Sequence, residues 1–594
     1  MKGEIEIMRF AKWGLAALLA AGQLGTAASG SARAESPAGQ MDTAMASNTA
    51  GKLVLTVGSA AALFEGKTYI AARPAVVKNG VTYVALRFMA ERLGASLATD
   101  PATGDTVLLS GGIELRYKSG SKLLKAGGIV YTMKGAPYAD RYALMVPVTS
   151  FAQGLNLPLS VSGSSLALQL QAANPAPQAY FETDKSSYRI GEPVQFQDLS
   201  TDDEDGIVER IWTGRQAAYF EPGNVTITLS VKDRHGSVSA YSRTIQIEDE
   251  VLYTKEAFDL LYAPVGQNIA VDGYAVKTME ALPYTYQSEG PVLIRSSGPE
   301  TVTEDGILYG EVADGPVRFL LHHKNKTGKR ARLHILATNE GTETATLTPG
   351  PEGTGGPTYY PGLAGKMSLA RFLSAVASGT AGQAISLAPG QSVELFDSLR
   401  AASPIPDDEV VTFTGELVSD KPIRYTVLLT ASDRDPIASL PNLPALDPRE
   451  SIVRGTFAGS TRTFDYAEPI GDRIVKLSLT DNTADPFQEG TDGILNTIAK
   501  NSGNYGLLYW LKLRKVAPHT LIAFNPRGGM YTGAALVNGQ TVTFSHLGAS
   551  GIQNEASVLY RTGDNEEEVN IAISPAAGSN LPFCLLFIPM PDPR

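Results

Sequence analysis

The sequence predicts a mainly β protein built from several domains. The chain has 594 residues, and at roughly 150 residues per domain this length predicts several domains and argues against a single hydrophobic core. Its 59 glycines and 36 prolines favour short strands joined by turns over long helices. Apolar residues make up 43% of the chain, which is ordinary for folded domains. We therefore expect a series of independently folded, β-rich domains.

The charge balance argues against a nucleic-acid partner. Lysine and arginine together number 50, aspartate and glutamate number 61, and the net charge is −11. A protein that neutralises many phosphates needs a spread of basic side chains over its surface. We expect no nucleic acid among the partners of this chain.

The N-terminal residues have the pattern of a secretory signal peptide. Three basic residues precede an apolar run at 13–22, and Ala-Arg-Ala at 32–34 offers a small-x-small cleavage pattern. The run is about ten residues long, whereas a membrane-spanning helix needs about 20. We expect a signal peptide at 1–34, a flexible lead-in at 35–51, and no transmembrane segment in the mature chain. The protein is then secreted, extracellular or associated with the cell wall.

One cysteine, Cys584, is present, so an exported chain forms no internal disulfide. Each domain must then be stable through its own core or a bound ion. Cys584 lies in the apolar run LPFCLLFI, which predicts a buried strand. We interpret it as a core residue and not as a nucleophile.

The first domain is predicted at 52–171 and contains an internal duplication. From 83 to 94 the sequence YVALRFMAERLG spaces its apolar residues as one face of a short helix. Residues 145–156, MVPVTSFAQGLN, repeat this pattern. A turn and a strand are predicted after each helix. The identical pairs are Val84 and Val146, Ala90 and Ala152, and Leu93 and Leu155.

These residues, together with GGIELRYKSGS at 111–121, resemble the copper amine oxidase N-terminal-like domain. The resemblance implies a small α/β module that is a non-catalytic appendage, thought to mediate attachment, often at the cell wall. The family is common in secreted proteins of spore-forming Gram-positive bacteria. It is not the copper-binding catalytic domain.

Copper amine oxidase activity is not expected. That enzyme needs three histidine ligands and a tyrosine in an N-Y-(D/E) motif, whereas residues 504–506 read Asn-Tyr-Gly and no H-x-H occurs in the chain. Adjacent His322 and His323 point to opposite faces of a predicted strand. His322 and His334 could still meet across a hairpin, which leaves a metal site as the weaker alternative to ordinary histidines.

A Pro-rich linker is predicted at 172–179, followed by a second domain at 180–250. Its tracts YRIGEPV and VTITLSVKDRHG, with Trp212, resemble a PKD domain. The resemblance implies an immunoglobulin-like β-sandwich that acts as a spacer or binding module. Residues 213–215, Thr-Gly-Arg, replace the glycine-rich turn of that family.

An acidic turn in this domain is the one cluster of carboxylates that could bind an ion. Asp202, Asp203 and Asp205 crowd carboxylates together, which repel each other unless a cation or solvent screens them. They match the D-x-D-G turn of the PKD pattern, where the turn is usually structural. We expect a plain acidic turn, with calcium as the weaker alternative and no other cofactor.

The remaining residues predict one or two β-sandwich-like domains. A β-rich domain with one helix is expected at 251–434, a Pro-rich linker at 435–450 and a second β-rich domain at 451–594. The helix is predicted around 369–376, where apolar residues follow i, i+3, i+4, i+7 spacing.

Two places in this half are candidate binding surfaces. Trp510, Lys512 and Arg514 share one face of a predicted strand, where an aromatic ring beside cations could stack on a sugar or polymer. The alternative is a tryptophan that covers the stems of its own neighbours. The sequence GTGGPTYY predicts a mobile loop in which Tyr359 and Tyr360 could bind a ligand or simply connect two elements.

No catalytic motif is evident. The chain has no G-x-S-x-G elbow and no phosphate-binding G-x-x-x-x-G-K-(S/T). We therefore predict a non-catalytic, secreted or wall-associated protein that binds a cell-wall polymer, an extracellular glycan or a protein. The alternative is a polysaccharide hydrolase with its active site in 251–594, because the spacing of paired carboxylates is a property of the fold.

Overall fold

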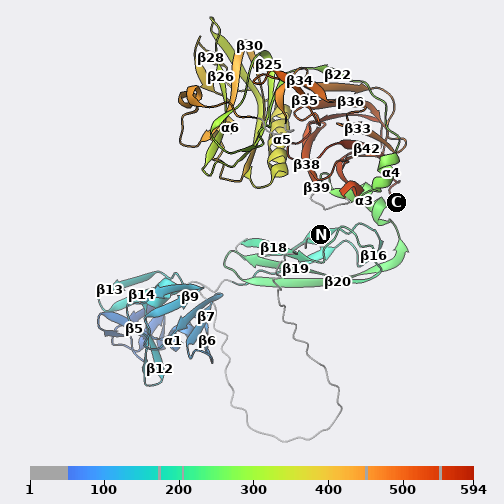
Figure 1. Cartoon of the computed structure of the whole chain (residues 1–594). Coiled ribbons are helices and arrows are strands. Elements are labelled where there is room, and N and C mark those ends of the chain that lie inside the picture. Colours follow the sequence, from blue (N-terminus) through green and yellow to red (C-terminus); the bar gives the residue numbers. More distant parts are fainter. Residues whose placement is uncertain (1–50, 171–174, 204–205, 448–452, 547–551) are drawn as a thin grey trace, which may run out of the picture. The chain divides into compact units, whose positions relative to one another are not determined.

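The computed structural model confirms a mainly β, multidomain chain (Figure 1). It describes residues 51–170, 175–203, 206–447, 453–546 and 552–594. The predicted signal peptide at 1–34 and nearly all of the predicted lead-in lie outside these residues. The chain divides into two compact units: 1–178 with 201–209 and 231–239, and 179–200 with 210–230 and 240–594.

The first domain consists of three antiparallel sheets and two short helices. Strands β5 and β12, which precede α1 and α2, pair with each other, and Val84 lies opposite Val146. The duplicated sequence thus places its two copies side by side. The elements are β1 (Gly51–Thr56), β2 (Ala61–Phe64), β3 (Lys67–Ile70), β4 (Val76–Lys78), β5 (Val81–Ala85), α1 (Leu86–Leu93), β6 (Ser96–Thr99), β7 (Thr106–Ser110), β8 (Ile113–Tyr117), β9 (Leu123–Ala126), β10 (Ile129–Thr132), β11 (Tyr138–Asp140), β12 (Ala143–Pro147), α2 (Thr149–Gly154), β13 (Leu159–Ser162) and β14 (Ser165–Leu170).

The second domain has the two sheets of a sandwich, one with the order β15-β17 and one with the order β16-β20-β19-β18. Along β19, buried residues alternate with more exposed ones, as the sequence predicts for a half-buried strand. The ring centre of Trp212 lies 4.8 Å from that of Phe181, and the Arg215 guanidinium lies 4.6 Å from the centre of the Trp212 ring. The strands are β15 (Phe181–Thr183), β16 (Ser187–Ile190), β17 (Phe196–Asp198), β18 (Ile207–Thr213), β19 (Gly223–Asp233) and β20 (Val238–Val251).

The C-terminal half contains an eleven-stranded sheet with its own core and two further sheets, of five and six strands, around a second core. Its elements up to residue 431 are α3 (Lys255–Tyr262), β21 (Asn268–Ala270), α4 (Gly273–Thr278), β22 (Gln287–Glu289), β23 (Val292–Ser296), β24 (Thr301–Val302), β25 (Gly306–Asn325), β26 (Ala331–Thr338), β27 (Ala345–Thr358), α5 (Pro361–Ser378), β28 (Ile385–Leu387), β29 (Ser392–Glu394), α6 (Asp397–Ala401) and β30 (Val410–Ala431).

The later elements complete these sheets. They are α7 (Pro436–Ser439), η1 (Leu440–Asn442), β31 (Arg454–Phe457), β32 (Thr461–Tyr466), β33 (Val475–Leu479), β34 (Gln488–Asp492), β35 (Thr497–Asn501), β36 (Leu508–Val516), β37 (Thr520–Pro526), β38 (Tyr531–Val537), β39 (Gln540–His546), η2 (Ile552–Asn554), β40 (Glu555–Arg561), β41 (Glu567–Ile573) and β42 (Phe583–Pro589). Cys584 is buried in β42, as its apolar neighbours predict.

Strand pairing crosses the boundary that the sequence predicts at 435–450. Strand β21 pairs with β40, and β22 pairs with β32. These early strands, at residues 268–289, therefore belong to the same sheets as strands that follow the predicted linker. Conversely, β31 pairs with β23 and extends the eleven-stranded sheet. A linear division at the prolines fails because partners in a sheet need not be neighbours in sequence.

Residues 353–358 are strand and not the loop that the sequence predicts. They end β27, which pairs with β30, and α5 begins at Pro361. Helix α5 packs directly on this strand (Figure 1). A Cβ at Gly355 would lie 2.0 Å from the carbonyl oxygen of Ala364, and one at Gly353 would lie 2.3 Å from that of Ser368. The glycines therefore allow the helix and the strand to approach closely, and they do not make this segment a mobile loop.

Helix α5 includes the predicted helical residues and continues beyond them at both ends. Leu369, Phe372 and Leu373 are buried. They belong to the core of the five- and six-stranded sheets, while the glycine strand belongs to the eleven-stranded sheet. The helix thus joins the two cores of this half.

We predict that Gly355→Ala lowers the free energy of unfolding by about 1–3 kcal/mol, because the added methyl overpacks the contact between β27 and α5. Gly563→Ala is the control, since a Cβ there meets no atom within 4 Å. Urea unfolding of both variants measures the difference. Equal stabilities would contradict the tight contact.

Candidate ligand-binding site

A cavity of about 350 Å³ lies among β23, β25, the start of α5 and the turns that precede β36 and β42. Its wall combines side chains from segments far apart in sequence. Strand β23 runs parallel to β25, with Arg295 opposite Leu320, so both strands present residues to the same cavity. The polar residues that line it are Arg295, Ser297, Glu300, His322, Ser579 and Asn580.

Arg295 is a buried cation on the wall of this cavity. Its side chain donates from Nη1 to Oδ1 of Asn501 at 2.6 Å, and its guanidinium lies 4.9 Å from the ring centre of Tyr505. Burial lowers the pKa of Arg295 to about 10, which leaves it charged at neutral pH. The Tyr505 hydroxyl donates to the carbonyl oxygen of Ser579 at 2.5 Å and so holds its ring in place.

His322 and His323 lie on opposite faces of β25, as strand geometry predicts. His322 Nδ1 lies 2.8 Å from the Thr412 hydroxyl, and its Nε2 lies 3.9 Å from a carboxylate oxygen of Glu300. His323 is held by the Ser296 hydroxyl at 3.0 Å. Burial lowers the pKa of His322 to about 3 and that of His323 to about 4, so both imidazoles are neutral at pH 7.

The prediction that His322 and His334 could meet across a hairpin is wrong. Strand β30 lies between β25 and β26, and it pairs with His322 at Thr412 but with His334 at Leu428. His334 instead contacts Glu394 at 2.6 Å. In the described part of the chain, no group of three or more His, Cys, Asp or Glu residues is placed to hold a metal ion.

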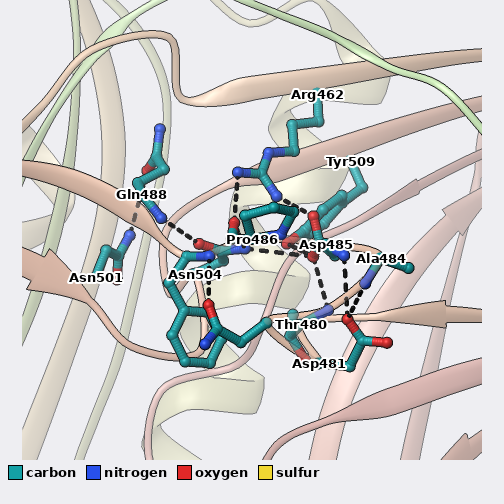
Figure 2. Close-up of polar contacts among 12 residues, drawn as sticks. Arg462, Thr480, Asp481, Ala484, Asp485, Pro486, Gln488, Asn501, Asn504 and Tyr509 are labelled. Atoms are coloured by element: carbon teal, nitrogen blue, oxygen red, sulfur yellow. Dashed lines mark hydrogen bonds and ion pairs between the residues drawn. The ribbon is translucent and has the colours of Figure 1, made fainter.

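A buried polar network adjoins the cavity through the hydrogen bond from Arg295 to Asn501. Figure 2 shows this network. At its centre is the carboxylate of Asp485, which is fully buried and pairs with Arg462. The carboxylate also accepts from the Tyr509 hydroxyl at 2.7 Å and from the backbone N–H of Thr480 at 2.7 Å. Burial, and then the Asp485 charge, raises the pKa of Tyr509 well above its usual value, so this hydroxyl remains a donor.

The network reaches Arg295 through amide side chains. Asn504 donates to Asp485 at 3.3 Å and accepts from the backbone N–H of Gln488 at 3.0 Å (Figure 2). The Gln488 side chain accepts from Asn501 at 3.3 Å, and Asn501 accepts in turn from Arg295. Gln488 joins the two parts of the network, since its backbone bonds Asn504 and its side chain bonds Asn501, and the network ends at the guanidinium of Arg295.

The surface candidates on β36 lie elsewhere. Trp510 is half-buried and packs against the core, although its strand face also carries Lys512 and Arg514. Lys512 Nζ lies 3.4 Å from Glu568, and Arg514 Nε donates to Asp465 at 2.6 Å. These contacts favour the alternative in which the tryptophan and the cations cover their own sheet.

The two tyrosines predicted in the aromatic loop are exposed, Tyr359 by 64% and Tyr360 by 70%. They follow strand β27, and the adjacent Pro361 lines the cavity. Neither tyrosine is itself in the cavity wall, nor is any of the three candidates on β36. Their binding roles stay predictions.

The acidic turn is described in part. Asp202 accepts a hydrogen bond from the backbone N–H of Gly206 at 2.8 Å, which is what a structural turn requires. Asp203 belongs to the same turn. Asp205, the third calcium candidate, lies outside the described residues.

The sequence analysis missed Arg295 and Asn580; it considered His322 only as a metal ligand and Tyr505 only for copper amine oxidase chemistry. One signal was present: an arginine inside the apolar strand VLIRS, where a charge is expected only with a partner or a function. Asn580 follows Gly578 in an irregular segment, and no pattern there indicated that it would face β23 and β25.

The fold and the cavity define a multidomain, β-rich protein with a polar pocket in its C-terminal half. Residues 38–109 and 63–169 match the family Copper amine oxidase N-terminal domain. The first domain therefore matches that family, as its duplicated sequence predicts. No curated protein matches the chain. No helix in the described stretches is both long and apolar enough to cross a membrane.

Solved structures similar to parts of the chain include two PKD domains. The PKD1 domain of Vibrio anguillarum Epp is 28% identical over 13% of this chain and 96% of its own, with a TM-score of 0.11. The PKD1 domain of the Vibrio cholerae metalloprotease PrtV is 29% identical over 13% of this chain and 100% of its own, with a TM-score of 0.11. A β-sandwich carbohydrate-binding module is 14% identical over 43% of this chain and 97% of its own, with a TM-score of 0.12.

We predict that Asp485→Asn lowers the free energy of unfolding by about 3–5 kcal/mol, because it leaves the buried Arg462 without its counter-ion. Asp465→Asn is the matched control: it removes the partner of Arg514 at a site where both side chains are about half exposed, and we expect near wild-type stability. Urea unfolding compares the two. Similar losses in both variants would contradict a central role for Asp485.

Trp510→Ala is expected to lower the free energy of unfolding by about 3 kcal/mol, because the indole packs against the core. Retention on purified cell walls should not change. Lys512→Gln serves as the control on the same strand face. A weaker retention with an unchanged melting temperature would instead support a binding role for Trp510.

Proposed function

We propose that this chain is a non-catalytic, secreted or wall-associated protein that binds a saccharide in the cavity beside Arg295 and His322. The observation that carries the proposal is the donor and acceptor content of that cavity. A carboxylate, an amide, the hydroxyl of Ser297, a neutral imidazole and a guanidinium line one pocket. Sugars present many hydroxyl groups, each of which is both donor and acceptor, and such a wall can satisfy them.

The dimensions support a small ligand or one end of a larger one. Ligand pockets usually enclose about 300–1,000 Å³, and the volume here is about 350 Å³. The ring of Tyr505 adds an apolar wall against which a sugar face can pack. A terminal sugar or short oligosaccharide fits this description better than the flat side of a long polymer.

The carboxylates of the cavity favour binding over hydrolysis. A glycosidase of the usual kind needs two carboxyl groups on either side of the scissile bond. Glu300 is the one carboxylate among the described residues that line the cavity. The titratable side chain beside it is His322, which is neutral at pH 7, so no second carboxyl group pairs with Glu300 on the described wall.

Export is part of the same proposal. It rests on the signal-peptide pattern at 1–34 and on the first domain, whose family is found in secreted proteins. The cell wall or an extracellular glycan is then the polymer that the cavity meets. Neither a metal nor an organic cofactor is required for this role.

We predict that the mature chain, 35–594, binds members of a glycan array and that Asn580→Ala and Glu300→Gln each weaken binding about tenfold, since each removes hydrogen bonds to the sugar. Glu340→Gln is the control, because Glu340 is about half exposed and pairs with Arg424 on another part of the surface. Titration calorimetry of the best array ligand measures the affinities.

Two results would overturn the proposal. Release of reducing ends from a retained glycan, abolished by Glu300→Gln, would establish the hydrolase alternative. Unchanged affinity in both cavity variants would place the binding site elsewhere.

A further inference from the structure

Buried arginines in this chain follow a rule with one exception. In the described stretches, Arg295, Arg318, Arg454 and Arg462 are buried. Three of them pair with a carboxylate: Arg318 with Glu416 at 2.7 Å, Arg454 with Asp492 at 2.8 Å, and Arg462 with Asp485. The exception, Arg295, lies on the wall of the cavity.

Arg295 is 93% buried, since 7% of its surface is exposed, yet it makes no ion pair with another described residue. Nη1 is occupied by the neutral amide oxygen of Asn501. Nε has no hydrogen-bond partner, and no hydrogen bond from Nη2 to a described residue is present. The Nε and Nη2 edge of the guanidinium is therefore unused.

Burying a cation without a counter-ion costs free energy, because the cation loses its hydration. Only a close opposite charge or several hydrogen bonds compensate for that loss. The ring of Tyr505 provides part of this compensation. The nearest acid in the cavity, Glu300, lies against His322 and not within ion-pair distance of the guanidinium. A counter-ion for Arg295 would therefore have to come from a bound ligand.

The free edge of the guanidinium matches one chemical group well. Nε and Nη2 together form a fork that binds a carboxylate through two parallel hydrogen bonds. A doubly charged phosphate is less suitable, because Glu300 already places one negative charge in the same cavity and His322 is neutral. A singly charged carboxylate offsets Arg295 and is repelled less by Glu300 than a doubly charged phosphate would be.

We infer that the cavity selects a carboxylated saccharide, with the sugar carboxylate on the free edge of Arg295 and the sugar hydroxyls toward Glu300 and Asn580. This inference rests on the proposed function and adds the class of sugar to it. Arg295 then determines specificity, and the network from Asp485 to Asn501 positions it.

The test uses matched disaccharides on the mature chain: a glucuronate, a galacturonate and a mannuronate, each with its methyl ester and its neutral hexose counterpart. Titration calorimetry should show that every disaccharide that binds is an acid and that its ester binds at least about tenfold more weakly. Esterification removes the charge and keeps the ring, so the comparison isolates the carboxylate.

Two variants assign the effect to Arg295. Arg295→Gln should reduce the preference for acid over ester to near unity, and Arg295→Lys should retain the charge but lose most of the preference, because an ammonium has no fork. Arg424→Gln removes an exposed arginine from another surface and should change nothing. Thermal melts report whether each variant folds, and Arg295→Lys keeps the test decisive if Arg295→Gln does not fold.

The outcomes separate the two proposals. Equal affinity for acid and ester, or tighter binding of the neutral sugars, would overturn the inference and leave saccharide binding intact. An acid preference that survives in both Arg295 variants would also overturn it. No binding of any array glycan or disaccharide would sink the proposed function together with the inference.

Discussion

The buried carboxylate of Asp485 is the interaction on which the C-terminal half depends. It satisfies an arginine, a tyrosine, an asparagine and a backbone N–H at once, and each of these groups belongs to a different segment (Figure 2). A charge at this depth is tolerable only when all its acceptor positions are used. The need to satisfy it therefore brings β32, β36 and the turns around β33 and β34 into one arrangement.

The same constraint extends outward to the cavity. Asn504, Gln488 and Asn501 form a relay of amides between Asp485 and Arg295. Amides suit this task because each can donate and accept at the same time. The result is a guanidinium that is held by a hydrogen bond at Nη1, while its Nε has no hydrogen-bond partner among the described residues.

Close packing supplies the other wall. Helix α5 lies on the glycines of β27 and contributes large apolar side chains to the core of the neighbouring sheets. The start of this helix, at Pro361, and the turn at Ala577 to Asn580 then complete the cavity around β23 and β25.

The sequence alone determined the class of fold, the duplicated first domain, the sandwich around Trp212, the core position of Cys584 and the helix at 369–376. These features depend on local periodicity and on turn residues, which are properties of neighbours in the chain. Tertiary structure decided the rest. Strand pairing between β23 and β31 and between β22 and β32 overrides the division at the prolines, and the packing of α5 turns a glycine-rich loop into a strand. Arg295, His322, Tyr505 and Asn580 are separated by as much as half the chain, and only long-range contacts place them together, because no local pattern encodes which distant strand a side chain will face.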